Sequence, residues 1–255
     1  MQLNYEFHPA AQASSKTPLL LIHGLFGSLS NLGMIARAFQ QQHDVIRIDL
    51  RNHGQSSHHP DMNYQLMAQD VEDTLDLLKI DQFAAIGHSM GAKVSMQLAA
   101  KLPSRIQQLI VLDMAPYAYQ ENHHDQIFKA LFAVQNAHIE SRKEATLIMQ
   151  QHIKDEMVIQ FLLKSFQKGH WLFNVDALFK HYGDIISWYG IETTDIATLF
   201  IRGGNSPYIC DEYHINAIEQ QFKYAQLKTI ENAGHWLHAE KTDQVNRLIE
   251  DFLNN

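Results

Sequence analysis

Ser89 lies in a short motif whose residue types suit nucleophilic catalysis. Residues 87–91 spell G-x-S-x-G, between an apolar run and a helical pattern. Glycines on both sides leave room for a sharp, strained turn that lifts the serine hydroxyl above a sheet. The turn also places the Met90 N–H at a helix N-terminus, where it can stabilise an oxyanion. We predict Ser89 as nucleophile and Met90 as oxyanion donor, against the alternative of a glycine-rich turn with a solvated serine.

The segment LLLIHGLFGSLSNLG at 19–33 offers a second oxyanion donor. A His-Gly pair directly after a strand can turn a backbone N–H toward a substrate oxygen. We predict Leu25 as that donor, with Phe26 as the alternative. If the loop is only a tight turn, His23 is a packing residue. Preorganised donors of this kind are worth on the order of 10²–10³ in turnover each.

His235 is the predicted general base. It lies in ENAGHWLHAEK, after an apolar run and before the last helical pattern, so the base follows the nucleophile in the chain. The alternative is a buried loop histidine without a catalytic role. His238 follows three residues later and is predicted to be structural, since only one of the two can hydrogen-bond to Ser89.

Strands alternating with helices must position these residues. Apolar runs bounded by turn residues predict strands, and apolar residues at helical spacing predict helices between them. The predicted strands are 18–22, 44–50, 83–87, 108–113, 198–203 and 226–232; the helices include 67–78, 94–102 and 245–252. This order predicts a parallel α/β sheet covered on both faces. Between about 117 and 190 the pattern is helical only, which indicates an insertion above the sheet.

Five blocks together resemble the α/β-hydrolase superfamily, and more closely the small bacterial carboxylesterases of the YbfF type. They are HGLFGSLSNLG, IDLRNHGQSS, GHSMGAK, FIRGGNSPY and AGHWLHAEK. The resemblance covers nearly the whole chain. It implies a mostly parallel eight-stranded sheet flanked by helices, formed by residues 1–116 and 191–255. It also implies a helical cap, residues 117–190, inserted after strand six, with residues 1–17 holding the first one or two strands.

The acid of the triad is not where many α/β-hydrolases carry it, because Asn205 and Ser206 occupy that loop. The resemblance implies Asp113 instead. Asp113 ends the run LIVLD, and in this superfamily a carboxylate at this strand end can also reach the histidine. Asp211 and Glu231 remain alternatives.

Ser206 has a supporting role in this hypothesis. Because it stands where the usual acid would reach, we expect its hydroxyl beside the hydrogen bond between Asp113 and His235.

The insertion is rich in aromatic residues, which can form its core, line an apolar acyl pocket, or both. The candidate pocket residues are Phe26, His88, Phe128, Phe161, Trp171 and Trp236.

Composition excludes several functions. The net charge of −8 argues against a nucleic-acid partner, which would be bound mainly by Lys and Arg. The single cysteine, Cys210, fits a reducing compartment and is predicted to be a passive thiol. No zinc-type spacing, signal peptide or membrane span is recognisable, so we expect a cytoplasmic protein without metal or cofactor.

The predicted function is a serine hydrolase that cleaves small acyl esters or thioesters through an acyl-enzyme on Ser89. We expect a carboxylesterase, with acyl-CoA thioesterase activity as a second possibility. The only partner that we predict is the small acyl ester or thioester substrate. Two alternatives use the same fold: a lyase or C–C bond hydrolase with this triad, and a non-catalytic receptor for a small ligand. The sequence does not indicate the oligomeric state.

Overall fold

A computed structural model of the protein describes residues 1–11, 16–120 and 124–254. Within this part, a central sheet has seven strands in the order β1-β3-β2-β4-β5-β8-β9. All neighbouring strands are parallel except β1, which pairs antiparallel with β3. The strands are β1 (Tyr5–His8), β2 (Leu19–Ile22), β3 (Val45–Ile48), β4 (Phe83–His88), β5 (Ile106–Leu112), β8 (Ala197–Gly203) and β9 (Ala225–Ile230).

The strand count corrects the expectation of eight strands. The described residues before β2 contribute the single strand β1, so the insertion follows the fifth strand of this sheet and not the sixth. Residues 12–15, 121–123 and 255, which belong to the predicted core and cap ranges, lie outside the described residues. The six strands predicted from apolar runs correspond to β2, β3, β4, β5, β8 and β9.

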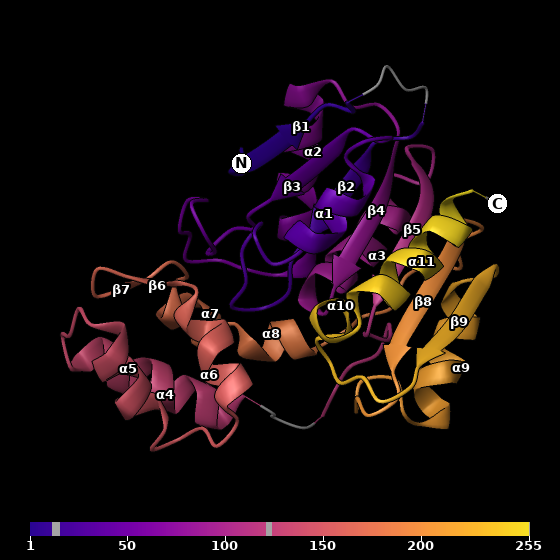
Figure 1. The fold of residues 1–255 in the computed structure, drawn as a ribbon. Coiled ribbons are helices and arrows are strands. Elements are labelled where there is room, and N and C mark those ends of the chain that lie inside the picture. Colours follow the sequence, from indigo (N-terminus) through magenta and orange to yellow (C-terminus); the bar gives the residue numbers. More distant parts are fainter. Residues whose placement is uncertain (12–15, 121–123, 255) are drawn as a thin grey trace.

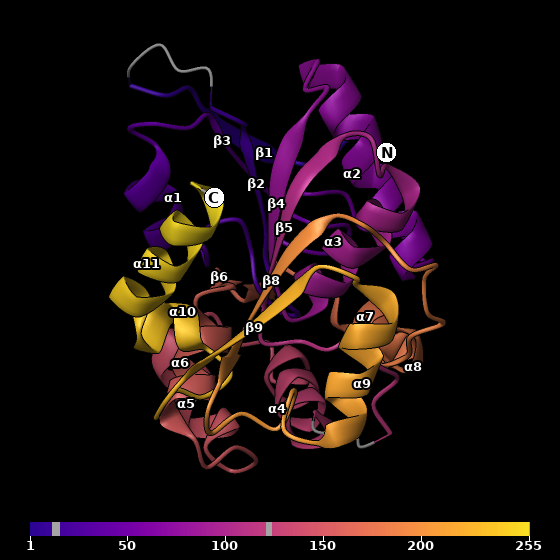
Figure 2. The same ribbon diagram turned by 90° about the vertical axis from the view of Figure 1, so that its right-hand side faces the viewer.

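Helices cover both faces of the sheet, because alternate strand residues point to opposite sides. Leu19 and Leu21 pack with α1 and α11, whereas Leu20 and Ile22 pack with α2 and α3. Figure 2 shows α1, α10 and α11 on one face and α2, α3 and α9 on the other. These helices are α1 (Gly33–Phe39), α2 (Tyr64–Leu78), α3 (Met90–Lys101), α9 (Glu212–Gln221), α10 (Leu237–Glu240) and α11 (Thr242–Leu253).

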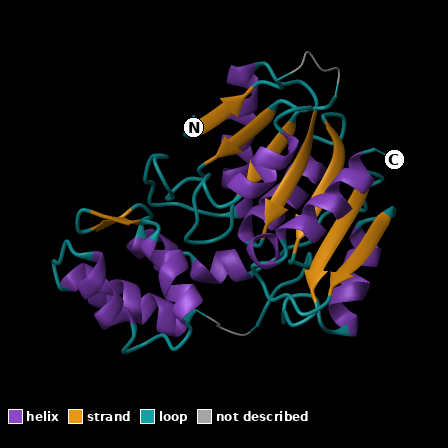
Figure 3. Ribbon diagram, viewed as in Figure 1, coloured by secondary structure: helices purple, strands orange, loops and turns teal. Residues whose placement is uncertain are grey.

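The segment between β5 and β8 lies beyond the carboxyl ends of the parallel strands (Figures 1 and 3). It is not purely helical as predicted, since Phe166–Gln167 and His170–Trp171 form a small antiparallel hairpin, β6 and β7. Its helices are α4 (Asp125–Asn136), α5 (Arg142–Met149), α6 (Glu156–Leu163), α7 (Val175–Lys180) and α8 (Tyr182–Ile186). We call this segment the cap. Ligands of open α/β sheets bind at these strand ends, so the cap covers the expected site.

The loop after β3 is held by the buried carboxylate of Asp49. The Asp49 carboxylate accepts hydrogen bonds from the N–H groups of Leu29 and Gln55, at 2.7 and 2.9 Å. Gly54 has φ +57°, and a Cβ there would come within 2.2 Å of that carboxylate. These contacts hold the residues after β3 in a turn. No helix in the described residues is both long and apolar enough to cross a bilayer.

Candidate active site

Ser89 sits on a strained turn between β4 and α3. Its backbone has φ 54° and ψ −119°, which places a non-glycine residue in a disfavoured region. A Cβ on Gly87 would lie 2.4 Å from the Gly91 carbonyl oxygen, and one on Gly91 would lie 2.3 Å from the Ile22 carbonyl oxygen. Close backbone packing therefore requires glycine at both positions, as expected from the G-x-S-x-G motif.

Three predicted residues, far apart in the chain, form one continuous series of hydrogen bonds. The Ser89 hydroxyl lies 2.9 Å from Nε2 of His235, and Nδ1 of His235 lies 2.7 Å from Oδ2 of Asp113. With Nδ1–H donated to the carboxylate, Nε2 is free to accept the serine proton. The ring of Tyr208 packs against the His235 ring with a centroid separation of 4.1 Å. This arrangement can deprotonate a serine and stabilise the imidazolium that results.

The carboxylate of Asp113 is fully buried at the end of β5, in another positive-φ conformation. Its Oδ1 accepts the Gly203 N–H at 2.9 Å, and its Oδ2 accepts a short hydrogen bond from the Ser206 hydroxyl as well as the His235 bond. Donors on both oxygens fix the orientation of the carboxylate. Ser206 thus lies beside the bond between acid and base, where it was expected.

The two alternative acids lie elsewhere. Asp211 caps α9 and is exposed, and its Oδ2 accepts from the Tyr213 hydroxyl at 2.7 Å. Glu231 follows β9 and is also exposed. In the described structure the carboxylate bonded to His235 is that of Asp113.

The loop after β2 separates the two candidate oxyanion donors. The N–H of Phe26 is used, because it donates to Nε2 of His53 at 3.2 Å. Within the described residues, the N–H groups of Leu25 and Met90 have no hydrogen-bond acceptor. Both residues line the cavity at Ser89. Leu25 is therefore better placed than Phe26 to bind a substrate oxygen.

Two buried histidines hold this loop in place. Nε2 of His23 accepts the Leu50 N–H at 3.1 Å while its Nδ1 donates to the Gly24 carbonyl at 2.7 Å. In His53, Nε2 accepts the Phe26 N–H and Nδ1 donates to the Arg51 carbonyl. Burial lowers the pKa of His23 and lowers that of His53 to about 3. Both rings stay neutral, as an imidazole that accepts a hydrogen bond must.

His88 and His238 support the loop that carries the base. Nε2 of His88 donates to the His235 carbonyl oxygen at 2.9 Å, and its ring packs on His238 at 4.4 Å between centroids. Burial lowers the pKa of His88 well below its usual value and that of His238 to about 3. Neither is bonded to Ser89 in the described structure, and both support the loop that carries His235.

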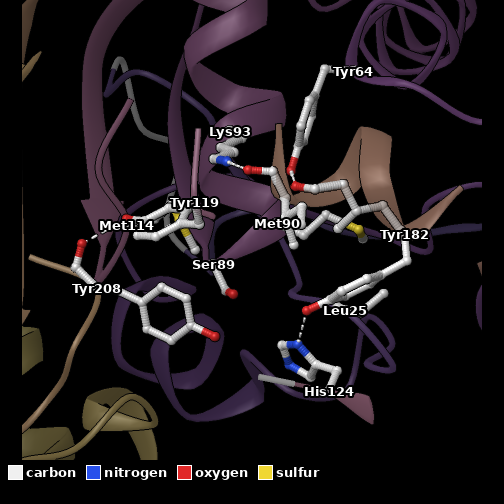
Figure 4. A pocket seen from close by; sticks show the side chains of 12 residues that line it. Leu25, Tyr64, Ser89, Met90, Lys93, Met114, Tyr119, His124, Tyr182 and Tyr208 are labelled. Atoms are coloured by element: carbon white, nitrogen blue, oxygen red, sulfur yellow. Dashed lines mark hydrogen bonds between the residues drawn. The ribbon is translucent and has the colours of Figure 1, made fainter. Parts of the chain in front are cut away.

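Two cavities meet at Ser89. The first, the inner pocket, has a volume of about 30 Å³. Its walls are Leu25, Tyr64, Ser89, Met90, Lys93, Met114, Tyr119, His124, Tyr182, Ile185, Ile186 and Tyr208 (Figure 4). The second, the outer trough, has a volume of about 300 Å³. Its walls are Gly24, Leu25, Phe26, Asn31, His88, Ser89, His124, Ile127, Val158, Phe161, Leu162, Pro207, Tyr208, His235, Trp236 and His238.

The predicted pocket residues divide into two groups. Phe26, His88, Phe161 and Trp236 line the outer trough. Phe128 and Trp171 line neither cavity. Phe128 packs edge-on against Phe26, with 5.4 Å between centroids, and the Trp171 indole donates to the Leu131 carbonyl at 3.2 Å. These two rings therefore belong to the core of the cap. The prediction was wrong for them because aromatic composition alone does not distinguish a ring that packs in a core from a ring that lines a cavity.

The sequence did not single out the polar residues of the inner pocket, chiefly Lys93 and the tyrosines Tyr64, Tyr119, Tyr182 and Tyr208. Lys93 had a usable signal. It lies four residues after Ser89 at the start of the same helix, and residues so spaced share a helix face. Tyr64 lies in α2 and Tyr182 in α8, whereas Tyr119 and Tyr208 lie in the segments that follow β5 and β8. No local sequence pattern connects these four residues.

One cluster has metal-binding residue types. Cys210, Asp211 and His214 place ligand atoms within 4.8 Å of one another. Their arrangement is already explained by the capping box of α9, in which His214 accepts the Asp211 N–H. Partial burial and the Asp211 carboxylate raise the pKa of the Cys210 thiol, which fits a passive thiol.

Known proteins resemble this chain over its whole length. It is 47% identical to the esterase YbfF of Escherichia coli over 100% of both proteins. The model of the alpha/beta hydrolase fold family also matches residues 17–136. The chain belongs to the α/β-hydrolase family. Family membership agrees with the strained serine turn and the parallel sheet described above.

Two further similarities are more distant. The chain is 34% identical to the mouse sn-1-specific diacylglycerol lipase ABHD11, over 92% of this chain and 80% of that protein. Among solved structures, a marine microorganism esterase superimposes with a TM-score of 0.92 and 32% identity, over 98% of this chain and 99% of that one. The marine esterase has the same fold as this chain, and both proteins carry names of ester-cleaving enzymes.

Proposed function

We propose that this protein is a serine esterase that hydrolyses carboxylic esters through an acyl-enzyme on Ser89. The observation that carries the proposal is the unbroken series of hydrogen bonds from Ser89 through His235 to Asp113. Relatives named esterase and lipase at 47% and 34% identity support it.

In the first half-reaction, the Ser89 oxygen attacks the ester carbon and His235 takes the serine proton. The carbonyl oxygen becomes an oxyanion, which the N–H groups of Leu25 and Met90 stabilise. The C–O bond to the alcohol then breaks, and His235 returns the proton to the departing oxygen. Asp113 keeps the His235 ring oriented and stabilises its charge, and the Ser206 hydroxyl holds the carboxylate.

In the second half-reaction, water attacks the acyl-enzyme and His235 takes its proton. The bond between the acyl carbon and the Ser89 oxygen breaks, the proton returns to that oxygen, and the carboxylic acid leaves. A thioester such as an acyl-CoA would react by the same steps with a thiol as the leaving group. A thioester therefore belongs in the test beside an oxygen ester.

The test is hydrolysis of a 4-nitrophenyl ester series from acetyl to palmitoyl, with acetyl-CoA in parallel. Wild type is compared with Ser89→Ala and with Ser104→Ala, a matched change at an exposed serine. We expect Ser89→Ala to lower kcat by at least about 10⁴-fold and Ser104→Ala to have no effect. No turnover by wild type would favour the lyase or receptor alternatives, and equal rates for wild type and Ser89→Ala would exclude Ser89 as nucleophile.

A further inference from the structure

Lys93 is a buried lysine one helical turn after the nucleophile. Its side chain is 1% exposed, and its ammonium donates to the carbonyl oxygens of Ile186 and Ser187 at 3.0 and 2.9 Å. It also lies over the Tyr119 ring, 4.9 Å from the centroid. The cap helix α8 ends at these carbonyls, so Lys93 reaches from the core helix α3 to the cap.

This ammonium lacks an anionic partner. No carboxylate forms an ion pair with Lys93 in residues 1–11, 16–120 and 124–254. Burial alone lowers the pKa of Lys93 to about 7. Lysine is seldom buried without a partner, because its charge loses hydration that two carbonyl dipoles restore only in part. An anion brought next to Lys93 would therefore be stabilised strongly.

Lys93 forms part of the wall of the inner pocket. In the view of Figure 4, Lys93 and Tyr64 lie on one side of the Ser89 hydroxyl, and Tyr208 and His124 on the other. Burial raises the pKa of Tyr64 and Tyr119 well above 10. The tyrosine hydroxyls are therefore uncharged and do not compete with an anion for Lys93. Tyr64 donates its hydroxyl hydrogen to the Ile185 carbonyl at 2.5 Å, and Tyr119 donates its own to the Tyr208 carbonyl at 2.6 Å.

The position of the base indicates which part of an ester occupies the inner pocket. The alcohol oxygen must lie near His235, which returns the proton to it. His235, His238 and Trp236 line the outer trough, and none of them lines the inner pocket. The alcohol therefore extends into the trough, and the acyl chain points into the inner pocket, past Met90 toward Lys93.

The inner pocket also limits the length of the acyl chain. Its volume of about 30 Å³ is far smaller than the volume of about 300 Å³ of the outer trough, so it admits a short chain and excludes a long one. This space fits a short chain with one polar end.

We propose that the inner pocket binds a short acyl chain ending in a carboxylate, as in a succinyl half-ester, and that Lys93 is the counter-ion of that carboxylate. The inference rests on the proposed esterase function and names its substrate class. Cleavage follows the steps given above, with a dicarboxylate as the acid product. Lys93 binds the far end of the acyl chain and exchanges no proton with the reacting atoms.

The test compares two esters of nearly equal shape, monomethyl succinate and methyl 4-methylpentanoate, in which an isopropyl group replaces the carboxylate. The value of kcat/KM is measured for each at pH 6.5 in wild type, Lys93→Met and Lys228→Met. Lys228 is an exposed lysine on β9, so its change removes the same charge far from the pocket. We expect wild type and Lys228→Met to prefer the acidic ester, and Lys93→Met to lower the acidic-to-neutral ratio by at least about tenfold.

The outcomes separate the two proposals. Turnover of the neutral ester that depends on Ser89, with no preference for the acidic ester or with an unchanged ratio in Lys93→Met, would overturn the role of Lys93 and leave the esterase function intact. Turnover of neither ester, nor of any 4-nitrophenyl ester, would overturn the esterase function itself. If Lys93→Met does not fold, competitive inhibition of wild type decides: succinate must inhibit more strongly than 4-methylpentanoate, and equal inhibition would contradict the proposal.

Discussion

The inner pocket and the outer trough meet at Ser89 but are built from different parts of the chain. Core helices α2 and α3, the end of α8 and several tyrosines enclose the small inner pocket, which has a buried cation in its wall. Cap helix α6 and the loop carrying His235 form the larger trough. The contrast suggests that the acyl side is recognised by shape and charge, whereas the alcohol side is only loosely recognised. The predictions below are in order of decreasing effect.

Replacing Asp113 with Asn should affect both sides of the ester alike. The amide can donate a hydrogen to His235 and thereby impose the wrong tautomer, so we expect kcat to fall by about 10⁴-fold. The loss should be the same for esters that differ in their acyl or alcohol part, because Asp113 contacts neither cavity. Parallel kcat measurements on ethyl acetate, butyl acetate and ethyl butyrate check this. Near-normal rates in Asp113→Asn would show that Asp113 is not the acid.

Acyl-chain length should matter far more than alcohol length. An acyl chain too long for the inner pocket must displace packed side chains, so kcat/KM should fall about 10- to 100-fold between butyryl and octanoyl methyl esters. Lengthening the alcohol from methyl to hexyl on an acetyl ester should change kcat/KM only a few-fold. The opposite pattern would mean that the acyl chain lies in the trough.

The preference for an acidic ester should depend on pH. Burial lowers the pKa of Lys93 to about 7, so its side chain is cationic below that pH and neutral above it. The Tyr64 and Tyr119 rings lie 5.7 and 4.9 Å from the Lys93 nitrogen, measured to their centroids. Burial raises the pKa of both hydroxyls well above 10, so they stay uncharged. The acidic-to-neutral ratio of kcat/KM should therefore fall about tenfold from pH 7 to 8.5. The titration of His235 cancels in this ratio, and a flat ratio would mean that Lys93 does not recognise the carboxylate.

Replacing Ser206 with Ala should have a smaller effect than replacing Asp113. The Asp113 carboxylate would lose one hydrogen bond but keep those from Gly203 and His235. We expect kcat to fall about tenfold and KM to stay within about twofold, since Ser206 lines neither cavity. A loss as large as that of Asp113→Asn would mean that Ser206 takes part directly in proton transfer.

Opening the trough should have the smallest effect. The Phe161 and Trp236 rings approach to 5.5 Å between centroids, which joins α6 of the cap to the loop of the base. Phe161→Ala removes the cap half of this contact, so KM for long-chain alcohol esters should change a few-fold while methyl esters react as before. Steady-state kinetics on methyl and octyl butyrates test this. A large kcat loss with methyl butyrate would show that the contact positions His235.

Two of the residues that we propose as catalytic could be located from the sequence because their signals are local. Ser89 and His235 each lie in a short motif beside a strand end, and apolar runs located the strands that bring those ends together. The acid was harder, because its partner His235 is 122 positions away and the residue types alone left Asp211 and Glu231 open. Resemblance, more than residue pattern, indicated Asp113.

The cavities could not be predicted because they depend on the positions of segments that are distant in sequence. Phe128 and Phe161 have similar surroundings in sequence, yet one packs inside the cap and the other lines the trough. In the part of the chain that the structure describes, β1 pairs with β3 alone, as a short antiparallel edge strand. Its partly exposed residues give little apolar signal. Both features are decided by tertiary packing.

The most direct test is a crystal structure of the protein after reaction with methyl 4-nitrophenyl ethylphosphonate. Attack by the nucleophile expels 4-nitrophenolate and leaves a phosphonate whose ethyl group mimics the acyl chain and whose methoxy group mimics the alcohol. We predict that phosphorus is bonded to the Ser89 oxygen, with the phosphoryl oxygen at the Leu25 and Met90 N–H groups. The ethyl group should lie in the inner pocket and the methoxy group in the trough. An adduct on another residue, or an ethyl group in the trough, would contradict this account.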